Sequence, residues 1–509
     1  MNQEIRLRFA PSPTGALHIG GLRTALYNYL LAKKLGGKFI LRIEDTDQTR
    51  FVEGAEKYII DSLIWAGLVP DEGVGFDGPY GPYRQSERTA IYKENVQNLI
   101  NKGYAYYAFD TPEELEKMRA ELATEANTMP KYDYKSRLKM KNSLTFSKED
   151  TENYLQSGKP YVIRLCVPVN EKVQIKDIIR GEVSFQSEEL DDKVLIKSDG
   201  LPTYHLANVV DDRLMKISHV VRGEEWLSST AHHVLLYRYF GWEAEMPEFA
   251  HLPLILKPNG KGKLSKRDGA EFGFPVFPID WKKDNDYFPG FREFGFLPEA
   301  VLNFLALLGW NSGTEQELFS LHEMIQNFSL EQIGKGGARF DFDKAKWFNA
   351  QYIQKSDPEI IKREILKLYK EQNLDPNETQ INIIYSLYKE RVHLLTEFYS
   401  QAKYIVTDQF DLNKDFVEKK WNNDAYEKYL RLIEDLKNLD NWTKERLEPV
   451  LKNFMEKESL KMGEVLPSLR VMLSGTPMGP DIYNMILALK REDLLERIEK
   501  NLEKLKTAK

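Results

Sequence analysis

The chain has 509 residues, of which 42% are hydrophobic and 29% charged, a composition typical of a folded protein with room for three or four domains. Its single cysteine, Cys166, excludes an internal disulfide and a zinc site built on several cysteines, and with no apolar leader we expect a cytoplasmic protein. The net charge of −7 and the short apolar runs exclude a strongly basic nucleic-acid-binding protein and a membrane-spanning one, but local contacts with RNA stay open.

The first 45 residues predict a strand, a helix and a second strand. Residues 4–9 ("EIRLRF") alternate in polarity, and residues 21–36 ("GLRTALYNYLLAKKLG") have helical periodicity that stops at Gly36 and Gly37. Residues 38–45 ("KFILRIED") have the pattern of another strand. Strands joined through a helix pair in parallel, and such sheets bind ligands beyond the carboxyl ends of their strands.

The rest of the chain changes character several times. Residues 111–160 are polar and rich in charge, and residues 161–185 alternate like antiparallel strands, so we predict an α+β insertion over 111–193. Strand-then-helix patterns return at 194–212 and 219–240, and almost everything after about residue 290 is helical. We therefore expect an α/β protein with a parallel sheet, an insertion and an all-α C-terminal part, divided at 1–110, 111–193, 194–255, 256–335 and 336–509.

The turn "PTGALHIGG" (13–21) opens the first predicted helix and could hold a phosphate. Glycines let a ligand approach the backbone, and N–H groups at a helix start favour anions. His18 adds a further polar ring at the same place. By itself, however, a histidine before Gly-Gly is more often a helix cap.

A second candidate for phosphate contact is "GKGKLSKRDG" (260–269), a glycine-flanked loop with four basic residues. Mobile cations suit a phosphate that gains negative charge during a reaction. This segment alone is more typical of a solvated basic loop.

Polar residues at the predicted strand ends could bind a small acidic amino acid. Arg8 and Arg222 can pair with carboxylates, and Glu44 can accept an ammonium group. Tyr204 and Asn208 are four residues apart, so one helical turn places them on the same face. Taken singly, each of these residues is as well explained by an ordinary surface ion pair.

The two phosphate motifs together resemble those of one enzyme class. "HIGG" at 18–21 resembles the HIGH signature of class I aminoacyl-tRNA synthetases, and "KLSKR" at 263–267 resembles their KMSKS loop. The stretches "RFAPSPTGALHIGGLRTALYNYLLAK", "LRIEDTD", "YHLANVVDD", "RGEEW" and "LRVMLSGTPMGPDIY" resemble bacterial glutamyl-tRNA synthetases along essentially the whole chain. The resemblance implies activation of L-glutamate with ATP to glutamyl-adenylate and its transfer to the 3′ end of tRNA(Glu), releasing AMP and pyrophosphate.

The resemblance also implies a role for each segment. Residues 1–110 and 194–255 would form the two halves of a Rossmann-like catalytic domain, and 111–193 an inserted acceptor-binding domain. Residues 256–335 would form a stem-contact region with the KLSKR loop, and 336–509 the anticodon-binding part. The expected protein is a cytoplasmic monomer that uses ATP with Mg²⁺.

Site residues follow from the matched positions. The family's catalytic positions are His18 and Lys266. Its ATP contacts match His18, Gly20, Gly21, Lys263, Ser265 and Lys266. Its glutamate pocket matches Arg8, Ala10, Ser12, Glu44, Tyr204, Asn208 and Arg222, with Glu44 expected to take the α-ammonium and the two arginines the two carboxylates, in an order left open.

For the tRNA we expect basic residues of the insertion to contact the acceptor arm and a C-terminal residue to lie near the anticodon. The acceptor-arm candidates are Lys131, Lys135, Arg137, Lys139 and Lys141, and the anticodon candidate is Arg470. We expect no metal site and no structural zinc. Where relatives have cysteines in "YRCFC", this chain has "YYAFD" (106–110), and Ala108 and Asp110 cannot make a thiolate site.

Related functions make different predictions. A glutaminyl-tRNA synthetase would have Pro and Glu in place of Ala10 and Ser12, and would end in β-barrels. A shorter paralogue that glutamylates a tRNA base would lack the C-terminal half, and a nucleotidylyltransferase would be a much shorter chain. A non-catalytic RNA-binding protein would leave Glu44 and the KLSKR loop without purpose.

Overall fold

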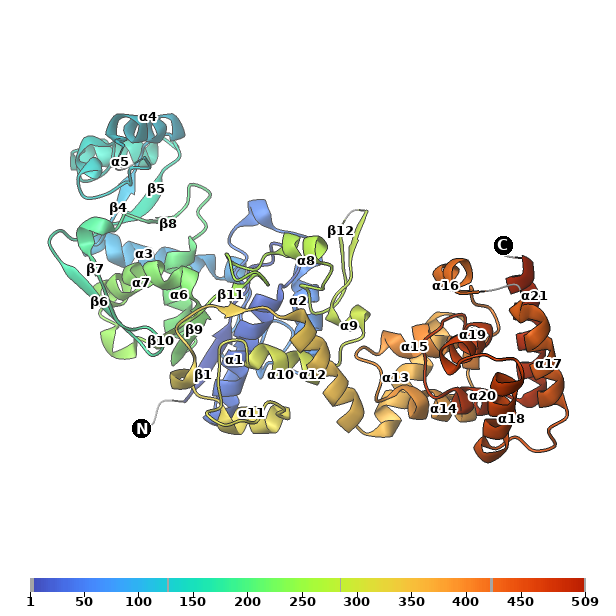
Figure 1. The fold of residues 1–509 in the computed structure, drawn as a ribbon. Coiled ribbons are helices and arrows are strands. Elements are labelled where there is room, and N and C mark those ends of the chain that lie inside the picture. The colour runs from blue at the N-terminus through green and yellow to red at the C-terminus, as the bar shows by residue number, and fades with distance from the viewer. Residues whose placement is uncertain (1–3, 126–127, 284, 422–423, 508–509) are drawn as a thin grey trace. The chain divides into compact units, whose positions relative to one another are not determined.

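The computed structural model describes residues 4–125, 128–283, 285–421 and 424–507. These residues belong to two compact units (Figure 1). The first unit comprises Met1–Phe291 and Val301–Phe342, and the second comprises Arg292–Ala300 and Asp343–Lys509. Three helices contain residues of both units: α9 (Phe291–Phe294), α10 (Pro298–Ala306) and α12 (Phe342–Lys355).

A seven-stranded sheet organises the first unit, with the strand order β3-β2-β1-β9-β10-β6-β7. Its strands are β1 (Arg6–Phe9), β2 (Lys38–Leu41), β3 (Glu72–Gly73), β6 (Lys172–Asp177), β7 (Gly181–Gln186), β9 (His219–Gly223) and β10 (Glu248–Leu252). Neighbouring strands pair in parallel, except that β6 and β7 form an antiparallel hairpin. The parallel α/β sheet predicted from the first 45 residues is confirmed.

The helix between β1 and β2 packs on the centre of this sheet. Helix α1 (Ile19–Lys34) contacts β1, β2 and β9, as Figure 1 shows. Leu22, Leu26 and Leu30 are fully buried along one side of the helix, because residues four apart share a helix face. The start of α1 lies at the carboxyl end of β1, where the sequence predicted the phosphate turn.

Other helices of the unit are α2 (Ala55–Trp65), α3 (Thr89–Asn101), α6 (Tyr204–Leu214), α7 (Leu227–Phe240), α8 (Lys266–Phe272) and α11 (Leu321–Asn327).

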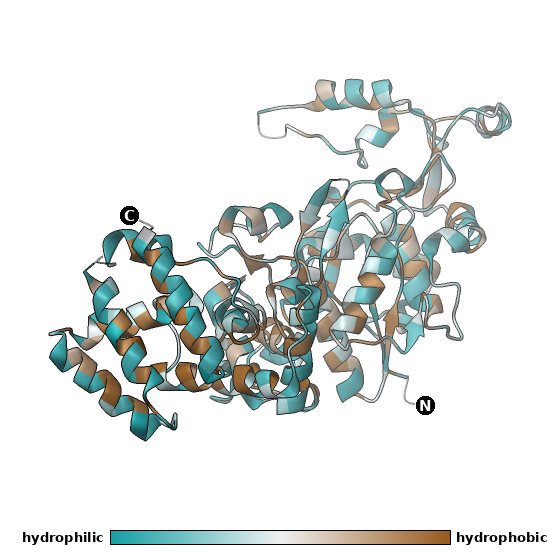
Figure 2. Cartoon of the chain, turned by 90° about the vertical axis from the view of Figure 1, so that its right-hand side faces the viewer, coloured by the Kyte–Doolittle hydropathy of each residue, from teal (hydrophilic) through white to brown (hydrophobic). Residues whose placement is uncertain are grey.

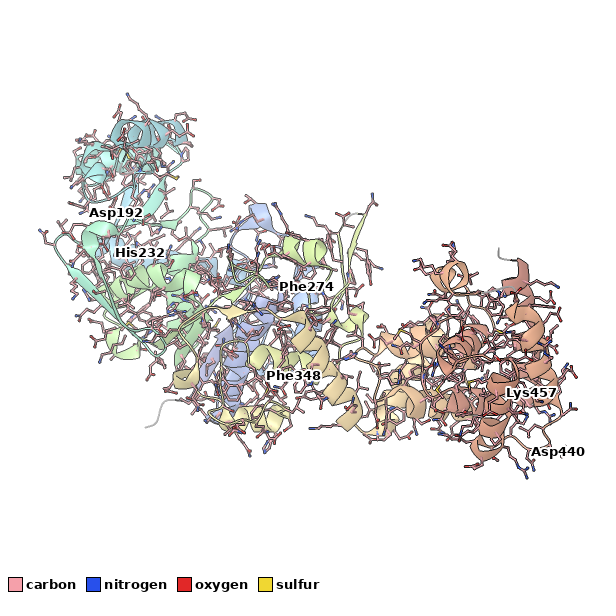
Figure 3. The ribbon with its side chains drawn as sticks, viewed as in Figure 1. Asp192, His232, Phe274, Phe348, Asp440 and Lys457 are labelled. Atoms are coloured by element: carbon pink, nitrogen blue, oxygen red, sulfur yellow. The ribbon has the colours of Figure 1, made fainter. Side chains whose placement is uncertain are left out.

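A smaller antiparallel sheet carries the inserted helices. It consists of β4 (Ala105–Ala108), β5 (Val162–Leu165) and β8 (Val194–Ile196), and the helices are α4 (Pro112–Leu122) and α5 (Lys148–Gln156). Asp192, labelled in Figure 3, is buried beside these strands and accepts a hydrogen bond of 2.6 Å from the hydroxyl of Tyr106. The carboxylate thus ties the last residues of the insertion to the first strand of the small sheet.

The expected insertion of residues 111–193 contributes to both sheets. The β6–β7 hairpin lies within this range but extends the large sheet, because Asp177 of β6 pairs with Phe249 of β10. The small sheet in turn uses β4 before residue 111 and β8 from Val194 onward. The domain boundaries drawn from the sequence stay predictions.

Two further pairs of short strands complete the first unit. Strand β11 (Ile255–Leu256) pairs in parallel with β14 (Ala338–Arg339), and β12 (Trp281–Lys283) pairs with the antiparallel strand β13 (Asp286–Phe288). The strand β14 lies inside the segment 336–509 that was expected to be wholly helical. Apart from these two residues, the described part of that segment has no strand.

The second unit is an all-helical bundle around a single apolar core. Its helices after α12 are α13 (Pro358–Glu371), α14 (Glu378–Tyr388), α15 (Thr396–Ala402), α16 (Lys414–Lys419), α17 (Ala425–Lys437), α18 (Lys444–Lys457), α19 (Met462–Ser474), α20 (Ile482–Leu487) and α21 (Arg491–Thr507). Along these helices hydrophobic and hydrophilic residues alternate in short stretches (Figure 2). Tyr369, Phe398, Leu447, Leu473 and Leu502 are among the fully buried residues that join them. The helical C-terminal part is confirmed.

No helix in the described chain combines the length and the apolarity that crossing a bilayer requires.

Candidate active site

A cavity of about 970 Å³ opens at the carboxyl ends of β1, β2 and β9. Arg8 and Arg222 come from β1 and β9 themselves, and Glu44 follows β2. Every residue predicted to bind glutamate or ATP lines this cavity: Arg8, Ala10, Ser12, His18, Gly20, Gly21, Glu44, Tyr204, Asn208, Arg222, Lys263, Ser265 and Lys266. Residues more than 250 positions apart therefore meet at one site, as expected where parallel strands end together.

His18 caps helix α1 and also faces the cavity. Its ring nitrogen Nδ1 accepts a hydrogen bond of 3.1 Å from the backbone N–H of Gly20. Since Nδ1 is the acceptor, the neutral ring carries its proton on Nε2. That Nε2 is buried and makes no hydrogen bond of ordinary geometry within the described residues, although the backbone of Ser265 lies close enough to favour a proton on the ring. The helix cap expected for a histidine in this position and a donor for a ligand are thus two ends of the same ring.

The pKa of His18 lies at about 4, below the ordinary 6.5. Burial is the main cause, and the nearby ammonium groups of Lys266 and Lys263 add to it, because both effects disfavour a positive charge on the ring. His18 is therefore neutral at physiological pH, with an Nε2–H group to donate.

Two glycines of the same turn leave little room for a side chain. A Cβ atom on Gly21 would lie 2.6 Å from Cδ1 of Leu17, so a larger residue could enter only if Leu17 moved. Gly15 has φ = 136°, a conformation that favours glycine, and a Cβ there would lie 3.3 Å from Nζ of Lys266. The turn at residues 15–21 and the KLSKR loop are therefore in contact.

An internal hydrogen-bond network holds the KLSKR loop. Ser265 donates from both its backbone N–H and its Oγ to Asp268, at 2.6 and 2.7 Å, and Lys257 pairs with the other carboxylate oxygen at 2.7 Å. Lys263 reaches Glu225 at 2.6 Å across the cavity rim. The sequence alone was more typical of a solvated loop, yet Lys263, Ser265 and Lys266 line the cavity, whereas Lys261 and Arg267 do not.

Lys266 is the cation of this loop that points toward the turn. Burial lowers its pKa below the usual value, and the nearby ammonium group of Lys283 contributes. No ion pair of Lys266 is found among the residues that the structure describes. Its charge is therefore available to an anionic ligand.

Arg8 lies in a buried ion-pair network at the floor of the cavity. Its Nε and Nη2 donate to the two carboxylate oxygens of Asp212 at 2.9 and 3.2 Å. Arg42 binds the same Asp212 at 2.7 Å and Glu44 at 3.1 Å. Burial raises the pKa of Asp212, but the two arginines outweigh it and the net shift is downward. The charge of Arg8 is thus already matched within the protein.

Glu44 and Asn208 form the side of the cavity next to this network. The side-chain amide of Asn208 donates to Oε1 of Glu44 at 3.1 Å. Burial raises the pKa of Glu44, although Arg42 and Arg8 oppose the shift. Tyr204 and Asn208 lie one turn apart on α6 and both line the cavity, as the spacing predicted.

Arg222 has a different environment. Its guanidinium donates to the hydroxyl of Tyr204, to Oγ1 of Thr230 at 2.8 Å and to Nε2 of His251 at 3.1 Å. All these partners are neutral, and no carboxylate pairs with Arg222 in the described part of the chain. Arg222 is only 6% exposed, and burial lowers its pKa. A buried cation with neutral partners is a strong attractor for a carboxylate ligand.

Four cavity or near-cavity residues were missed by sequence reasoning. Arg42 precedes Glu44 by two positions, and Asp212 follows Asn208 by four, so strand and helix periodicities could have pointed to them. Trp226, whose ring centroid lies 4.5 Å from that of Tyr204, stands in the motif "RGEEW". His251 gave no pattern, because its partner Arg222 is 29 residues away.

The residues predicted to contact the acceptor arm divide into two groups. Lys131, Lys135 and Lys139 are exposed, and Lys141 is exposed but paired with Glu114. Arg137 is buried and donates to the carbonyl of Val167 at 2.9 Å and to Asp192 at 3.1 Å. Because it serves the interior, Arg137 is not part of a surface for RNA.

Arg470, the anticodon candidate, is half-buried in the second unit. Its Nη2 donates to the carbonyl of Pro480 at 3.0 Å, and burial lowers its pKa. One edge of this guanidinium is therefore occupied by the chain itself.

Within the described residues, no group of three or more His, Cys, Asp or Glu side chains could hold a metal ion. At the position where zinc-binding relatives were expected to have cysteines, Asp110 accepts from Tyr132 at 3.0 Å and from the backbone N–H of Lys141 at 2.8 Å. These two hydrogen bonds to Asp110 connect the end of the "YYAFD" segment with residues 132 and 141.

Two protein families match the chain. Residues 4–347 match the family "tRNA synthetases class I (E and Q), catalytic domain", and residues 345–502 match "Anticodon binding domain". Curated relatives include a glutamate–tRNA ligase of Flavobacterium psychrophilum, 50% identical over 98% of this chain and 99% of its own length. Another is a glutamate–tRNA ligase of Phocaeicola vulgatus, 49% identical over 99% of both chains.

Solved structures give the same result. A crystal structure of a glutamate tRNA ligase from Elizabethkingia meningosepticum in complex with its amino acid is 46% identical, has a TM-score of 0.89, and matches over 99% of this chain and 100% of its own. A glutamate–tRNA synthetase from Elizabethkingia anophelis is 45% identical with a TM-score of 0.87, over 98% and 100% of the two chains.

Proposed function

The chain belongs to the glutamate–tRNA ligases, a family of class I aminoacyl-tRNA synthetases, and we propose that the cavity at the end of its parallel sheet is the active site. As a member of this family it activates L-glutamate with ATP and charges tRNA(Glu). The observation that carries the proposal is Arg222, a buried arginine that lines the cavity and has only neutral partners among the described residues.

Glutamate binding follows from the charges of the cavity. Arg222 takes a carboxylate of the substrate, because the chain provides it with no carboxylate within the described residues. Arg8 already donates two hydrogen bonds to Asp212, so it does not offer a free pair of N–H groups to the substrate. It contributes its positive potential to the site. Glu44 accepts the α-ammonium group, steadied by Asn208, while Ala10, Ser12 and Tyr204 complete the pocket wall.

ATP binds on the opposite side of the same cavity. The Nε2–H of His18 donates to a phosphate oxygen, and Gly20 and Gly21 let the phosphate chain approach the helix start. Lys263 and Ser265 shape the loop that presents Lys266. Mg²⁺ travels with the nucleotide and neutralises phosphate charge; no described cluster of metal-ligating side chains would hold it apart from ATP.

The reaction needs positioning and charge stabilisation. A glutamate carboxylate oxygen attacks the α-phosphorus of ATP, the bond to the leaving phosphate breaks, and pyrophosphate departs. Lys266 balances the negative charge that develops on the α-phosphate. A ribose hydroxyl at the 3′ end of tRNA then attacks the acyl carbon and AMP leaves. The protein forms no covalent bond with the substrates in this scheme. Most of the acceleration therefore comes from holding the reactants close together in the correct orientation.

The insertion and the second unit bind the tRNA in this proposal. Lys131, Lys135, Lys139 and Lys141 contact the acceptor arm, and the region of Arg470 meets the anticodon. We propose that the protein acts as a cytoplasmic monomer. Reversing the charge of the four lysines should raise the KM for tRNA and weaken its salt dependence, without changing the KM for glutamate.

The experiment that tests the function is amino-acid-dependent ATP–pyrophosphate exchange, with glutamate or glutamine, in the presence and absence of tRNA(Glu). Exchange with glutamate but not glutamine is the expected result, since a buried arginine left unpaired by an amide is costly. We expect exchange to require the tRNA. Exchange without tRNA would favour the chemistry of the shorter paralogue, and no exchange with either amino acid would overturn the proposal.

A further inference from the structure

Behind Arg222 lies a buried chain of three side chains on three adjacent strands. The Nε of Arg222 in β9 donates to Nε2 of His251 in β10 at 3.1 Å, and Nδ1 of His251 is 2.6 Å from Oδ2 of Asp177 at the end of β6. His251 and Arg222 are register partners in the sheet, and the side chains of His251 and Asp177 are both 0% exposed. Neither His251 nor Asp177 lines the cavity.

The hydrogen bonds allow only one arrangement of protons. An arginine Nε can only donate, so Nε2 of His251 must be the acceptor and its proton must be on Nδ1. Nδ1 then donates to Asp177. The other oxygen of Asp177 accepts from the backbone N–H groups of Ile179 and Arg180 at 3.0 and 2.8 Å, which fixes the carboxylate. Asp177 therefore sets the tautomer of His251, and His251, together with Tyr204 and Thr230, sets the direction of Arg222.

From this geometry we propose that His251, oriented by Asp177, is a positioning residue that holds the guanidinium plane of Arg222 for the carboxylate of glutamate. The inference rests on the proposed role of Arg222 in binding that carboxylate. His251 does not touch the substrate; it acts through Arg222.

A neutral imidazole does what a carboxylate in its place could not. A carboxylate would orient Arg222 but would also cancel its charge and compete with the substrate, as Asp212 does for Arg8. The imidazole accepts the Nε–H and leaves the positive charge uncompensated. Burial lowers the pKa of His251 and keeps the ring neutral beside Arg222, although Asp177 opposes the shift.

The first variants compare an acceptor with none. His251→Leu removes the acceptor and should raise the KM for glutamate about 10- to 100-fold, the size of one hydrogen bond to a charged group, and leave the KM for ATP unchanged. His251→Gln keeps an acceptor near the position of Nε2 and should restore most of the affinity. The matched control is His219→Gln, which replaces a histidine of the neighbouring strand β9. It should leave the KM for glutamate and the KM for ATP unchanged.

Asp177→Asn tests the tautomer. The amide oxygen is needed by the two backbone N–H groups, so its NH₂ would face Nδ1 and force the proton of His251 onto Nε2, where it meets the Nε–H of Arg222. We expect an increase in the KM for glutamate like that of His251→Leu. An unchanged KM in folded Asp177→Asn would contradict the proposed proton arrangement.

A double-mutant cycle separates positioning from packing. Lysine has no Nε–H of this kind, so in an Arg222→Lys background His251→Leu should add no further loss for glutamate. A full additional loss would show that His251 acts through general packing and would overturn the inference. If His251→Leu does not fold, Asp177→Asn, alone and in the Arg222→Lys background, gives the same comparison.

Failure of this inference is distinct from failure of the proposed function. If Arg222→Leu binds glutamate as well as the wild-type protein does, the role of Arg222 is wrong and the inference falls with it. If Arg222→Leu loses glutamate but His251→Leu and Asp177→Asn do not, only the positioning role is wrong.

Discussion

The two arginines at the carboxyl ends of β1 and β9 are satisfied in opposite ways. Arg8 is 3% exposed and binds both oxygens of Asp212, so its charge is neutralised by the chain itself. Arg222 is 6% exposed and donates to a phenol, an alcohol and an imidazole, all neutral. The two arginines of this pocket therefore differ in role. Arg8 stabilises the ion-pair network beneath the cavity, and Arg222 presents a positive charge to the substrate.

This difference has an energetic consequence. Removing one member of a buried ion pair leaves the charge of the other uncompensated and destabilises the fold. A buried charge that has no counter-ion already destabilises the folded state, so its removal costs little stability. The loss of Arg8 should therefore be seen in stability, and the loss of Arg222 in substrate binding. The five predictions below test this division and extend it to the phosphate side of the cavity.

The largest expected effect is on Arg222. Arg222→Leu should lower kcat/KM for glutamate about 1,000-fold, because the substrate carboxylate would be buried without its partner. The same variant should be at least as resistant to urea as the wild-type protein, since an unpaired buried charge has been removed. Steady-state exchange kinetics and urea unfolding measure the two effects. A variant that unfolds at clearly lower urea would contradict the comparison.

The next effect concerns Lys266. Lys266→Met should lower kcat for pyrophosphate exchange about 100- to 1,000-fold, with a much smaller change in the KM for ATP, because the ammonium group acts on charge that develops in the transition state. Lys261→Met is the matched control on the same loop and should be as active as the wild-type protein, since Lys261 does not line the cavity. Equal losses in the two variants would mean that the loop acts through its overall charge.

The third prediction is the counterpart of the first. Arg8→Leu should reduce the free energy of unfolding by about 3 kcal/mol, because Asp212 keeps only Arg42 as a partner. Arg213→Leu breaks an exposed pair with Glu245 near the end of α6 and should cost less than about 1 kcal/mol. Urea unfolding of the three proteins makes the comparison. A loss in Arg8→Leu no larger than that in Arg213→Leu would contradict it.

The pH dependence of this effect follows from Asp212. Its pKa in the folded protein lies below the ordinary value of 3.8, so the stabilisation is present above pH 3.8 and is lost as pH falls through the folded pKa. The difference between wild type and Arg8→Leu should therefore be constant near neutrality and shrink in acid. A difference that grows as the pH falls would show that Asp212 is not the group involved.

The smallest effect is on the titration of His18. NMR should give a pKa of about 4 in the wild-type protein. In Lys266→Met it should rise, because a neighbouring cation is removed, but remain below 6.5 because burial is the larger cause. The pKa of His219, which is set by burial and Glu248, should not move. An unchanged pKa of His18 would place Lys266 farther from the ring in solution.

Much of the site could be predicted from the sequence because its residues stand in short, contiguous motifs. His18, Gly20 and Gly21 lie in one turn, and Lys263, Ser265 and Lys266 lie in one loop, so each group can be recognised without knowing the fold. The parallel sheet also followed from a local strand–helix–strand pattern. The roles of the individual residues stay predictions until the variants above are measured.

Other features could not be predicted because they depend on which strands become neighbours. The alternating pattern of residues 161–185 indicated antiparallel strands, and β6 and β7 within this range do pair in that way. Only the pairing of β6 with β10 places these two strands on the large sheet. Likewise, the sequence shows Arg137 only as one of several basic residues. Its burial against Asp192, 55 residues later, depends on the tertiary structure.

By itself the sequence determined the elements, their order and the residue types available to bind an anion, because these depend on neighbours within a few positions along the chain. Only the tertiary structure decided which cations are free to do so. Arg8 and Arg222 are indistinguishable in the sequence, and it is the arrival of Asp212 beside one and of His251 beside the other that separates them. The physical reason is that a buried charge is governed by what lies within hydrogen-bonding distance in space, and these partners lie 204 and 29 positions away in the chain.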